Sequence, residues 1–290
     1  MRLHLSFSQI DHYKQLIRFD RPIGTLLLLW PTLCALWLAS GGSPQISNLI
    51  IFSLGCLVMR SAGCVINDYA DRKVDGDVAR TKDRPIAAGN VGATEALQLF
   101  ALLGVIAFGL VLLTNALTIQ LAFVAMGLAA LYPFMKRYTH WPQLVLGAAF
   151  GMATPMAYAA EMNSLPVTVW LLFCINVAWT VAYDTFYAMT DREDDIKIGI
   201  KSTAVLFGEF DRIITGTLQV IVLLGLGLLG RMYFMGNWYY LAWLVIAALF
   251  AYQQYLIKDR DPQQCLQAFL NNNYVGAVLF AGIAADFALQ

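Results

Sequence analysis

Two groups of acidic side chains occupy matching places in the sequence, and each follows directly on a long apolar stretch. The first group lies within residues 67–75 and contains Asp68 and Asp71; the second lies within residues 184–195. Carboxylates beside hydrocarbon are costly and are found there with a partner or a function. Oxygen-rich groups of this kind suit Mg²⁺ and, through it, a phosphate ligand. The two groups therefore predict a site for phosphate chemistry.

The spacing of the first group predicts a shared helical face. Asn67, Asp71 and Asp75 are four residues apart, so a helix that continued through them would stack their side chains. Asp68 lies one position aside. Like charges at this spacing repel by roughly 0.2–0.5 kcal/mol per pair, and a bound dication would remove that cost. The alternative is a solvated helix end at a membrane surface.

The second group repeats the arrangement. Asp184, Asp191 and Asp195 fall at positions i, i+7 and i+11, and Tyr187 shares their face if one helix carries them all. The two groups align at a spacing of 116 residues, which suggests two related halves with the site where they meet. Two equivalent groups on the same side of the membrane count strongly against two chance helix ends.

Three cations are candidates to bind an anionic substrate. Arg60 lies about two turns before Asn67 inside an apolar stretch, where a guanidinium needs a diphosphate or the acidic group, unless it snorkels to the surface. Lys201 follows the second acidic group and could reach the same phosphate. Arg137 is the best placed cation that is not adjacent in sequence to either acidic group. The alternative is that Arg137 only anchors its helix at the membrane interface.

The composition is that of an integral membrane protein. The 290 residues are 59% hydrophobic and 13% charged, with a mean hydropathy of +0.62, whereas soluble domains carry about 25% charged residues. Helices of roughly 20 residues match a bilayer core of about 30 Å. We expect an all-α bundle, a single domain over residues 1–290, with nine membrane-spanning helices: Ile23–Ala39, Ile46–Ile66, Ala96–Leu113, Leu117–Tyr132, Leu144–Ala160, Val167–Met189, Ile213–Gly230, Trp238–Ile257 and Leu270–Leu289.

The distribution of Lys and Arg predicts the orientation. The N-terminal segment and the loops after the second, fourth, sixth and eighth predicted helices hold seventeen of the nineteen basic residues. By the positive-inside rule these parts and both acidic groups face the cytoplasm, and the C-terminus faces out. The two long loops, 67–94 and 190–212, are both on this side. No secretory or mitochondrial leader is evident at the N-terminus, so we expect a multi-pass protein of the bacterial inner membrane.

These residues resemble the UbiA superfamily of intramembrane prenyltransferases, and their neighbours resemble its 4-hydroxybenzoate polyprenyltransferase branch. The similarity spans nearly the whole chain. The resemblance to the superfamily rests on the paired aspartate motifs, which are Asn67-Asp68-x-x-Asp71-x-x-x-Asp75 and the set Asp184, Asp191 and Asp195. The resemblance to the branch rests on the flanking sequence segments, which are Met59-Arg60-Ser-Ala-Gly63-Cys64, Arg84-Pro85, Tyr183-Asp184-Thr-Phe-Tyr187 and Gly199-Ile-Lys201-Ser202-Thr203.

The resemblance implies a nine-helix bundle with a central cavity open sideways to lipid, two pseudo-equivalent aspartate-rich cytoplasmic loops, and transfer of a polyprenyl group from polyprenyl diphosphate to 4-hydroxybenzoate. The new bond forms at the ring carbon meta to the carboxylate, in ubiquinone biosynthesis. Mg²⁺ ions would bridge the aspartates and the diphosphate. The implied catalytic and metal-binding residues are Asp71, Asp75, Asp191 and Asp195, and the substrate-binding residues are Asn67, Asp68, Arg60, Arg137, Asp184, Tyr187 and Lys201.

Two finer assignments follow from this reaction. Asp191 is a candidate to remove the ring proton or to orient the phenol. The anionic acceptor needs a cation for its carboxylate, and with Arg60 and Lys201 assigned to the diphosphate, Arg137 is the first choice and Arg21 the second.

Two other functions stay open. One is a prenyltransferase with a different aromatic acceptor, and the other is an ion-coupled transporter, which would place its acids near the midplane on broken helices. No nucleic-acid partner is expected.

Overall fold

The computed structural model describes residues 5–73, 75–77 and 81–289 of the chain. Every regular element in these residues is a helix. Eight helical segments in this described part of the chain are long and apolar enough to cross a membrane. They are built on α2 (Ile23–Ser40), α3 (Ile46–Asp71), α4 (Ala93–Val111), α5 (Ala116–Tyr138), α8 (Val167–Met189), α11 (Asp211–Met232), α12 (Asn237–Leu256) and α13 (Pro262–Leu289).

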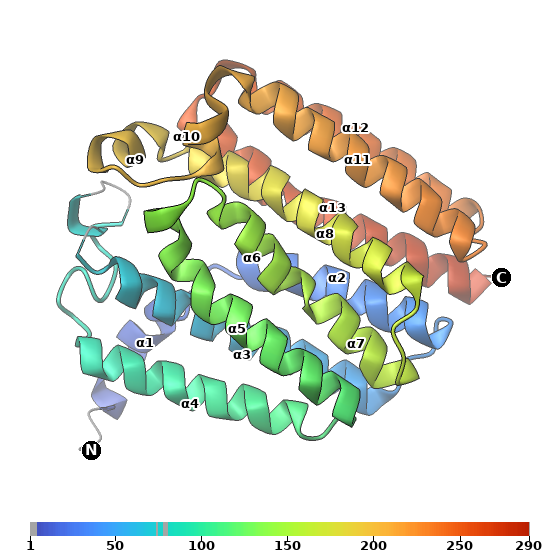
Figure 1. Cartoon of the computed structure of the whole chain (residues 1–290), viewed down its shortest axis with the longest axis horizontal. Coiled ribbons are helices and arrows are strands. Elements are labelled where there is room, and N and C mark those ends of the chain that lie inside the picture. Colours follow the sequence, from blue (N-terminus) through green and yellow to red (C-terminus); the bar gives the residue numbers. More distant parts are fainter. Residues whose placement is uncertain (1–4, 74, 78–80, 290) are drawn as a thin grey trace.

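Shorter helices join these segments, and several gather at the end of the bundle where α3 ends, which we call the acidic end (Figure 1). The N-terminal helix α1 and helices α9 and α10 lie there, opposite the C-terminus. Residues 74 and 78–80 of the first predicted loop lie outside the described residues. The short elements are η1 (Phe7–Gln9), α1 (Ile10–Leu16), η2 (Asp75–Asp77), α6 (Pro142–Gly151), α7 (Ala153–Met162), α9 (Arg192–Ile198), α10 (Thr203–Phe207), η3 (Gly208–Phe210) and η4 (Ile257–Asp259).

The fifth predicted span is not one helix. It consists of α6 and α7, ten residues each, which follow one another along the bundle with a break at Met152. The cause is Pro155, which has no N–H to donate to the carbonyl of Gly151 and whose ring crowds that carbonyl. The hydroxyl of Thr154 donates to it instead, at 2.8 Å. The proline therefore divides the predicted span into two helices, an effect that a hydropathy pattern does not report.

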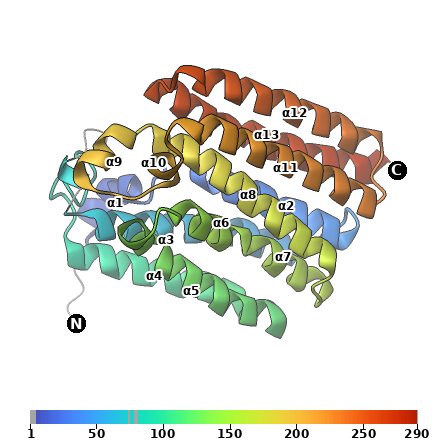
Figure 2. The ribbon, with the colours of Figure 1, turned by 45° about the horizontal axis from the view of Figure 1, so that its top comes forward.

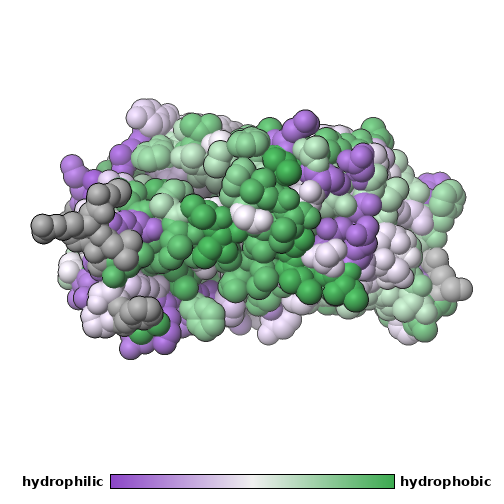
Figure 3. Space-filling model, turned by 90° about the horizontal axis from the view of Figure 1, so that it is seen from below, coloured by the Kyte–Doolittle hydropathy of each residue, from purple (hydrophilic) through white to green (hydrophobic). Residues whose placement is uncertain are grey.

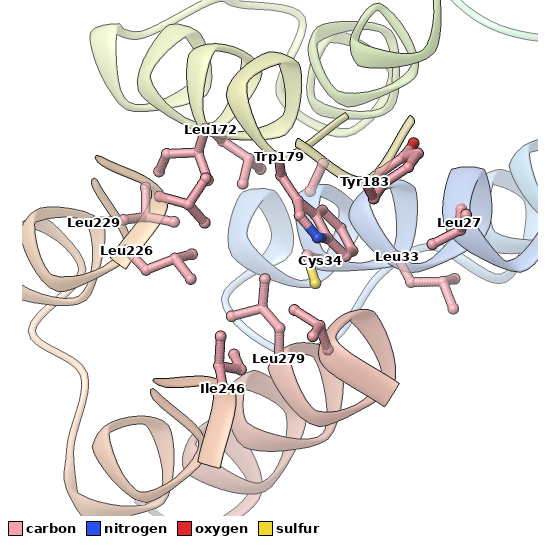
Figure 4. Packing of buried hydrophobic residues seen from close by; sticks show 14 of the residues in the cluster. Leu27, Leu33, Cys34, Leu172, Trp179, Tyr183, Leu226, Leu229, Ile246 and Leu279 are labelled. Atoms are coloured by element: carbon pink, nitrogen blue, oxygen red, sulfur yellow. The ribbon is translucent and has the colours of Figure 1, made fainter. Parts of the chain in front are cut away.

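Helix α8 lies in the middle of the larger core, where Trp179 and Tyr183 meet side chains of α2 and α13 (Figure 4). Three successive asparagines of α13 bind three different helices. Asn271 accepts a hydrogen bond from Gln253 of α12, Asn272 from Trp179 of α8, and Asn273 from Trp30 of α2, at 2.8–2.9 Å. Hydrogen bonds between apolar helices fix their register, because the alternative is an unsatisfied polar group in hydrocarbon.

Helices α4 and α5 form the outer wall on the opposite side of the bundle (Figures 1 and 2). Helix α4 packs on α3, and α5 packs on α6 and α7, while α4 and α5 touch each other little. Only 11% of either membrane segment is buried, because the side chains of both helices lie mostly on the outer surface or along an interior cavity. Figure 3, seen from the side of α4, shows the resulting apolar band between more polar ends.

Candidate active site

Helix α3 brings the first acidic group to the acidic end. Asn67, Asp68 and Asp71 occupy its last two turns, but the helix ends at Asp71 instead of continuing through Asp75. Arg72 supplies a physical reason, since its guanidinium donates to the carbonyl of Tyr69 at 2.6 Å and lies over the Tyr69 ring. The prediction that Asp75 shares a helical face with Asn67 and Asp71 is therefore wrong.

Asp75 nevertheless returns to the group through Arg84. One nitrogen of Arg84 lies 3.0 Å from an Asp75 oxygen and 3.1 Å from an Asp68 oxygen. Thr81 lies beside Asp75, and its hydroxyl donates to the Asp75 carbonyl at 2.8 Å. Asp68 and Asp75 are 1% and 5% exposed, so the shared guanidinium offsets the repulsion between two buried carboxylates.

A second arginine reaches Asp68 from the N-terminal segment. Arg18, two residues beyond α1, donates to both Asp68 oxygens at 2.8 and 2.9 Å. Its backbone has φ = +57°, a conformation that costs a non-glycine residue about 1–3 kcal/mol and that clusters at functional sites. The N-terminal segment is thus part of the site.

Asp71 is paired on one side only. Its Oδ2 accepts a hydrogen bond from the ammonium of Lys136, near the end of α5. Its Oδ1 is buried and has no hydrogen-bond partner in the described part of the chain. A buried carboxylate oxygen without a donor is costly, and a cation is the ligand that suits it.

The second acidic group is also divided between two helices. Helix α8 ends at Met189 and α9 begins at Arg192. The prediction that one helix carries both Asp184 and Asp195 is therefore wrong. The hydroxyl of Thr190 donates to the Tyr187 carbonyl at 2.6 Å, and this local bond competes with continuation of the helix. Asp191 lies in the break, directly before α9.

Helix α9 is anchored by charge because none of its residues is buried. Its first residue, Arg192, forms an ion pair with Asp211, which is fully buried at the start of α11. Arg260 donates to both oxygens of the same carboxylate at 2.9 and 3.2 Å. The hydrogen bond to Asp211 also raises the pKa of Arg260. Asp211 thereby ties the segment that carries Asp191 and Asp195 to the rest of the bundle.

Arg60 lies deeper along α3, two turns inside Asn67. Its guanidinium packs against Gly24 of α2, where any Cβ would overlap it, and beside the Cys64 sulfur. The Nε atom is buried and has no hydrogen-bond partner among the described residues. Asp184 and Tyr187 of α8 are among the groups that interact with its charge. Arg60 is thus a partly buried cation whose buried Nε has unused hydrogen-bonding capacity.

All of these elements surround one cavity of about 1360 Å³. Its polar end lies among the aspartates. Its apolar arm runs between α3, α4, α5 and α6 as far as Thr114 and Met156, near the opposite end of the bundle. Ten of the eleven predicted site residues line it: Arg60, Asn67, Asp68, Asp71, Asp75, Asp184, Tyr187, Asp191, Asp195 and Lys201.

Arg137 is the predicted residue that is not in this lining. Its guanidinium donates to the backbone carbonyl of Ala70 at 2.6 Å and lies 5.9 Å from the centre of the Phe134 ring. Its neighbour Lys136 lines the cavity instead. Adjacent residues of a helix point in directions about 100° apart. The sequence alone therefore did not show which of Lys136 and Arg137 faces the cavity.

Sequence reasoning also missed three cations, Arg18, Arg84 and Lys136, as partners of the aspartates. Positive charge in these segments was read mainly as the cytoplasmic bias of membrane proteins. For Arg84, the Arg84-Pro85 segment that resembles the family could have indicated a role in the site. Arg18 had no comparable signal, because its role depends on how the N-terminal segment folds back on α3.

The aspartates are not gathered as a closed metal site. In residues 5–73, 75–77 and 81–289, no three acidic, His or Cys side chains lie close enough together to hold an ion. Two features fit a divalent cation held jointly with a phosphate ligand. One is Asp71 Oδ1, which has no hydrogen-bond partner among the described residues, and the other is the presence of hard carboxylate oxygens on two sides of the cavity.

Comparison with known proteins gives relatives over almost the full length. A protein of Pseudomonas aeruginosa (strain UCBPP-PA14) named 4-hydroxybenzoate octaprenyltransferase is 56% identical over 278 residues, which are 96% of this chain and 94% of the relative. One of the same name from Vibrio vulnificus (strain CMCP6) is 57% identical over 283 residues, 98% of this chain and 100% of the relative.

Solved structures share the fold. The apo structure of a UbiA homolog from Aeropyrum pernix K1 aligns with a TM-score of 0.81 at 23% identity, covering 90% of this chain and 97% of that one. A UbiA homolog from Archaeoglobus fulgidus bound to GPP and Mg²⁺ aligns with a TM-score of 0.73 at 18% identity, covering 96% and 100%. The model of the UbiA prenyltransferase family matches residues 28–275, and the chain belongs to that family.

Proposed function

We propose that this protein transfers a polyprenyl group from polyprenyl diphosphate to the ring carbon meta to the carboxylate of 4-hydroxybenzoate, a step of ubiquinone biosynthesis. The observation that carries the proposal is the cavity of about 1360 Å³, which has aspartates and cations at one end and an apolar arm that runs along the bundle. This shape and polarity suit a diphosphate head joined to an isoprenoid tail. The two relatives named above support the acceptor.

Asp71, Asp75, Asp191 and Asp195 are the residues that would hold Mg²⁺. Support comes from the open oxygen of Asp71 and from the carboxylate-only donor set, which is the hard-oxygen chemistry that Mg²⁺ prefers. The Archaeoglobus fulgidus homolog with the same fold was solved with GPP and Mg²⁺. When bound, Mg²⁺ supplies positive charge that offsets the charge on the leaving diphosphate.

The chain's own cations assist the departure of the diphosphate. Arg18, Arg84 and Lys136 already lie at the polar end, and each can exchange an aspartate oxygen for a phosphate oxygen once a cation joins the carboxylates. Lys201 and Asn67 add donors at the same level. As the C1–O bond of the prenyl diphosphate breaks, the electron pair leaves with the diphosphate, and these donors stabilise it.

The ring carbon of the acceptor then forms the new bond to C1, and the ring proton must pass to a base. Asp191 is our candidate for that base or for orienting the phenol, because it lies in the break before α9 and lines the cavity. Asp184 and Tyr187 line the same region from α8. The apolar walls limit access of water to the cationic carbon.

Arg60 is better supported than Arg137 as the partner of the acceptor carboxylate. Arg60 lines the cavity and has a buried Nε without a partner among the described residues, whereas the Arg137 guanidinium is bound to the Ala70 carbonyl. The diphosphate has cations of its own nearer the aspartates. Arg21, the second choice from the sequence, also lines the cavity but is 78% exposed beside Asp20. Arg60 is therefore the better candidate for the second anion.

The chain crosses the bacterial inner membrane nine times as one domain, with its active site toward the cytoplasm. Eight segments qualify as spans individually. The two ten-residue helices α6 and α7 with Met152 between them add about 30 Å at 1.5 Å per residue, the thickness of the hydrocarbon core. The Lys and Arg bias supports the orientation.

Purified protein in detergent or nanodiscs, given radiolabelled prenyl diphosphate, Mg²⁺ and 4-hydroxybenzoate, tests the proposal. We expect a prenylated product with the new carbon–carbon bond meta to the carboxylate. Parallel reactions with a hydroxynaphthoate and with other phenols test the alternative acceptor. Transfer to one of these, with none to 4-hydroxybenzoate, would overturn the acceptor assignment but keep the reaction class.

A further inference from the structure

A row of residues leads from the aspartates into the apolar arm. Asp71, Asn67, Gly63, Met59 and Gly55 are spaced four apart on α3, and all five line the cavity. Successive members of the row are neighbours on the helix surface, each about 40° further round the axis than the last, so the row winds along α3 as it leads away from the aspartates. The row begins with oxygen ligands, and two of its three apolar positions carry no side chain.

The glycines of this row differ from the packing glycines of the bundle. A Cβ at Gly276 would come within 2.7 Å of Trp30, and one at Gly147 within 3.1 Å of the Val177 carbonyl. Such glycines allow helices to approach closely. At Gly55 and Gly63 a Cβ would meet nothing within 4 Å. Close packing therefore does not explain these two positions.

The facing wall of the arm is also built from small residues. Helix α4 contributes Gly104, where a Cβ likewise meets nothing within 4 Å. Helices α4 and α5 also contribute six alanines to the lining, namely Ala101, Ala107, Ala122, Ala125, Ala129 and Ala130. The arm is therefore wide along the length of α3 that Gly63 and Gly55 occupy.

Helix geometry gives the depth of each glycine. At 1.5 Å per residue, Gly63 lies about 8 Å and Gly55 about 20 Å along α3 from Asp68. Three bonds of an extended chain span about 3.5 Å, so a four-bond isoprene unit spans roughly 5 Å. A two-unit geranyl tail thus ends well before Gly55, while a tail of more than four units passes it.

We infer that the isoprenoid tail of the donor lies along this α3 row, and that the missing side chains at Gly55 and Gly104 determine how long a tail the site accepts. The inference rests on the proposed function and deepens it by assigning the length limit to particular residues. Filling the arm at the depth of Gly55 should exclude long tails without touching short ones, since the reacting C1 atom stays among the aspartates.

The test compares Gly55→Phe with the unmodified protein, using geranyl diphosphate and octaprenyl diphosphate as donors. We expect kcat/KM for the geranyl donor to stay within about twofold, and kcat/KM for the octaprenyl donor to fall at least about tenfold. Phenylalanine has a higher helix propensity than glycine, so the helix itself should form. Gly104→Phe, on the facing wall, should give the same selectivity and decides the matter if Gly55→Phe does not insert.

Gly109→Phe is the matched control. Gly109 is also a glycine of α4 whose Cβ would meet nothing within 4 Å, but it does not line the cavity. This variant should treat both donors as the unmodified protein does. Equal effects of Gly55→Phe and Gly104→Phe on the two donors, whether a loss or no change, would overturn the inference.

A binding measurement separates this inference from the proposed function. In Mg²⁺ buffer without any acceptor, both diphosphates should raise the Tm of the unmodified protein, and in Gly55→Phe only the octaprenyl shift should shrink. If the unmodified protein transfers neither tail to 4-hydroxybenzoate, the proposed function fails, and the Tm shifts still report the path of the tail. Equal shifts in both proteins would refute that path.

Discussion

The backbone N–H of Lys201 donates to the backbone carbonyl of Lys136 at 3.1 Å. This bond joins the loop after the second acidic group to the end of α5. The side chain of Lys136 pairs with Asp71 of the first group. The two halves of the site are therefore connected through a single residue that belongs to neither acidic motif.

Lys136→Met should weaken binding of the donor. The ammonium contributes a charge-assisted hydrogen bond worth about 1.5–3 kcal/mol, so we expect KM for prenyl diphosphate to rise by about one order of magnitude or more. KM for 4-hydroxybenzoate should change little. Lys258→Met, which removes an exposed lysine beside Asp259, is the control. Unchanged donor KM in Lys136→Met would remove Lys136 from the diphosphate site.

Neighbouring aspartates on α9 offer a matched test of the metal site. Asp195 lines the cavity, whereas Asp194 does not and pairs with Lys197 at 3.3 Å on the outer side. Asp195→Ala should lower kcat at least about 100-fold, because a metal ligand acts on the leaving group. Asp194→Ala should stay near the unmodified rate.

Metal removal checks the same assignment. Excess EDTA should abolish transfer, and added Mg²⁺ should restore it. We expect Asp71→Ala, Asp75→Ala and Asp191→Ala to resemble Asp195→Ala in rate while still inserting in the membrane. Full activity in EDTA, or in Asp191→Ala, contradicts the assignment.

The sequence predicted the membrane class and ten of the polar residues that line the cavity, because hydropathy and the aspartate spacing are local properties. The prediction failed at the ends of helices, where local backbone and side-chain hydrogen bonding determines the structure. Helix breaks at Met152 and around Asp191 follow from Pro155 and from a Thr190 side-chain bond, which no hydrophobic pattern contains.

The partners of the aspartates were missed for a different reason. Arg18 meets Asp68 across 50 residues of sequence, and its left-handed backbone aims the side chain inward. Lys136 meets Asp71 across 65 residues. Such pairs depend on tertiary packing. The many Lys and Arg residues in the same segments of the sequence made these cations hard to distinguish from residues expected only to set the orientation.

Asp211→Asn should loosen α9 without touching the substrates. The change removes the charge that holds Arg192 and Arg260 and leaves two arginines facing each other. Because Arg260 is 36% exposed, we expect a loss of about 2 kcal/mol in the free energy of unfolding, below the range for fully buried pairs. The Mg²⁺ concentration for half-maximal rate should also rise, since α9 carries Asp195.

Asp259→Asn is the control for this position, as Asp259 is 70% exposed beside Lys258. Urea or thermal unfolding in detergent measures stability, and a Mg²⁺ titration of the rate measures the site. A drop in stability with an unchanged Mg²⁺ titration would show that Asp211 supports the fold but does not position the metal-binding segment.

If the chain crosses the membrane nine times, as proposed, its two ends lie on opposite sides. A reporter that is active only in the periplasm should therefore be active when fused to the C-terminus and silent when fused to the N-terminus. The result depends on whether α6 and α7 together cross the membrane. A cytoplasmic signal from the C-terminal fusion would mean that they do not.

Arg60 and Arg137 can be separated by the same conservative change. Lysine keeps the charge of either residue but loses the planar pair of donors that matches a carboxylate. If Arg60 binds the acceptor, Arg60→Lys should raise KM for 4-hydroxybenzoate about tenfold, the equivalent of 1.4 kcal/mol, and leave KM for the donor nearly unchanged. Arg137→Lys should affect neither KM strongly, because its guanidinium is bound to the Ala70 carbonyl. The reverse pattern would assign the carboxylate to Arg137, and a rise confined to the donor KM in Arg60→Lys would place Arg60 in the diphosphate site.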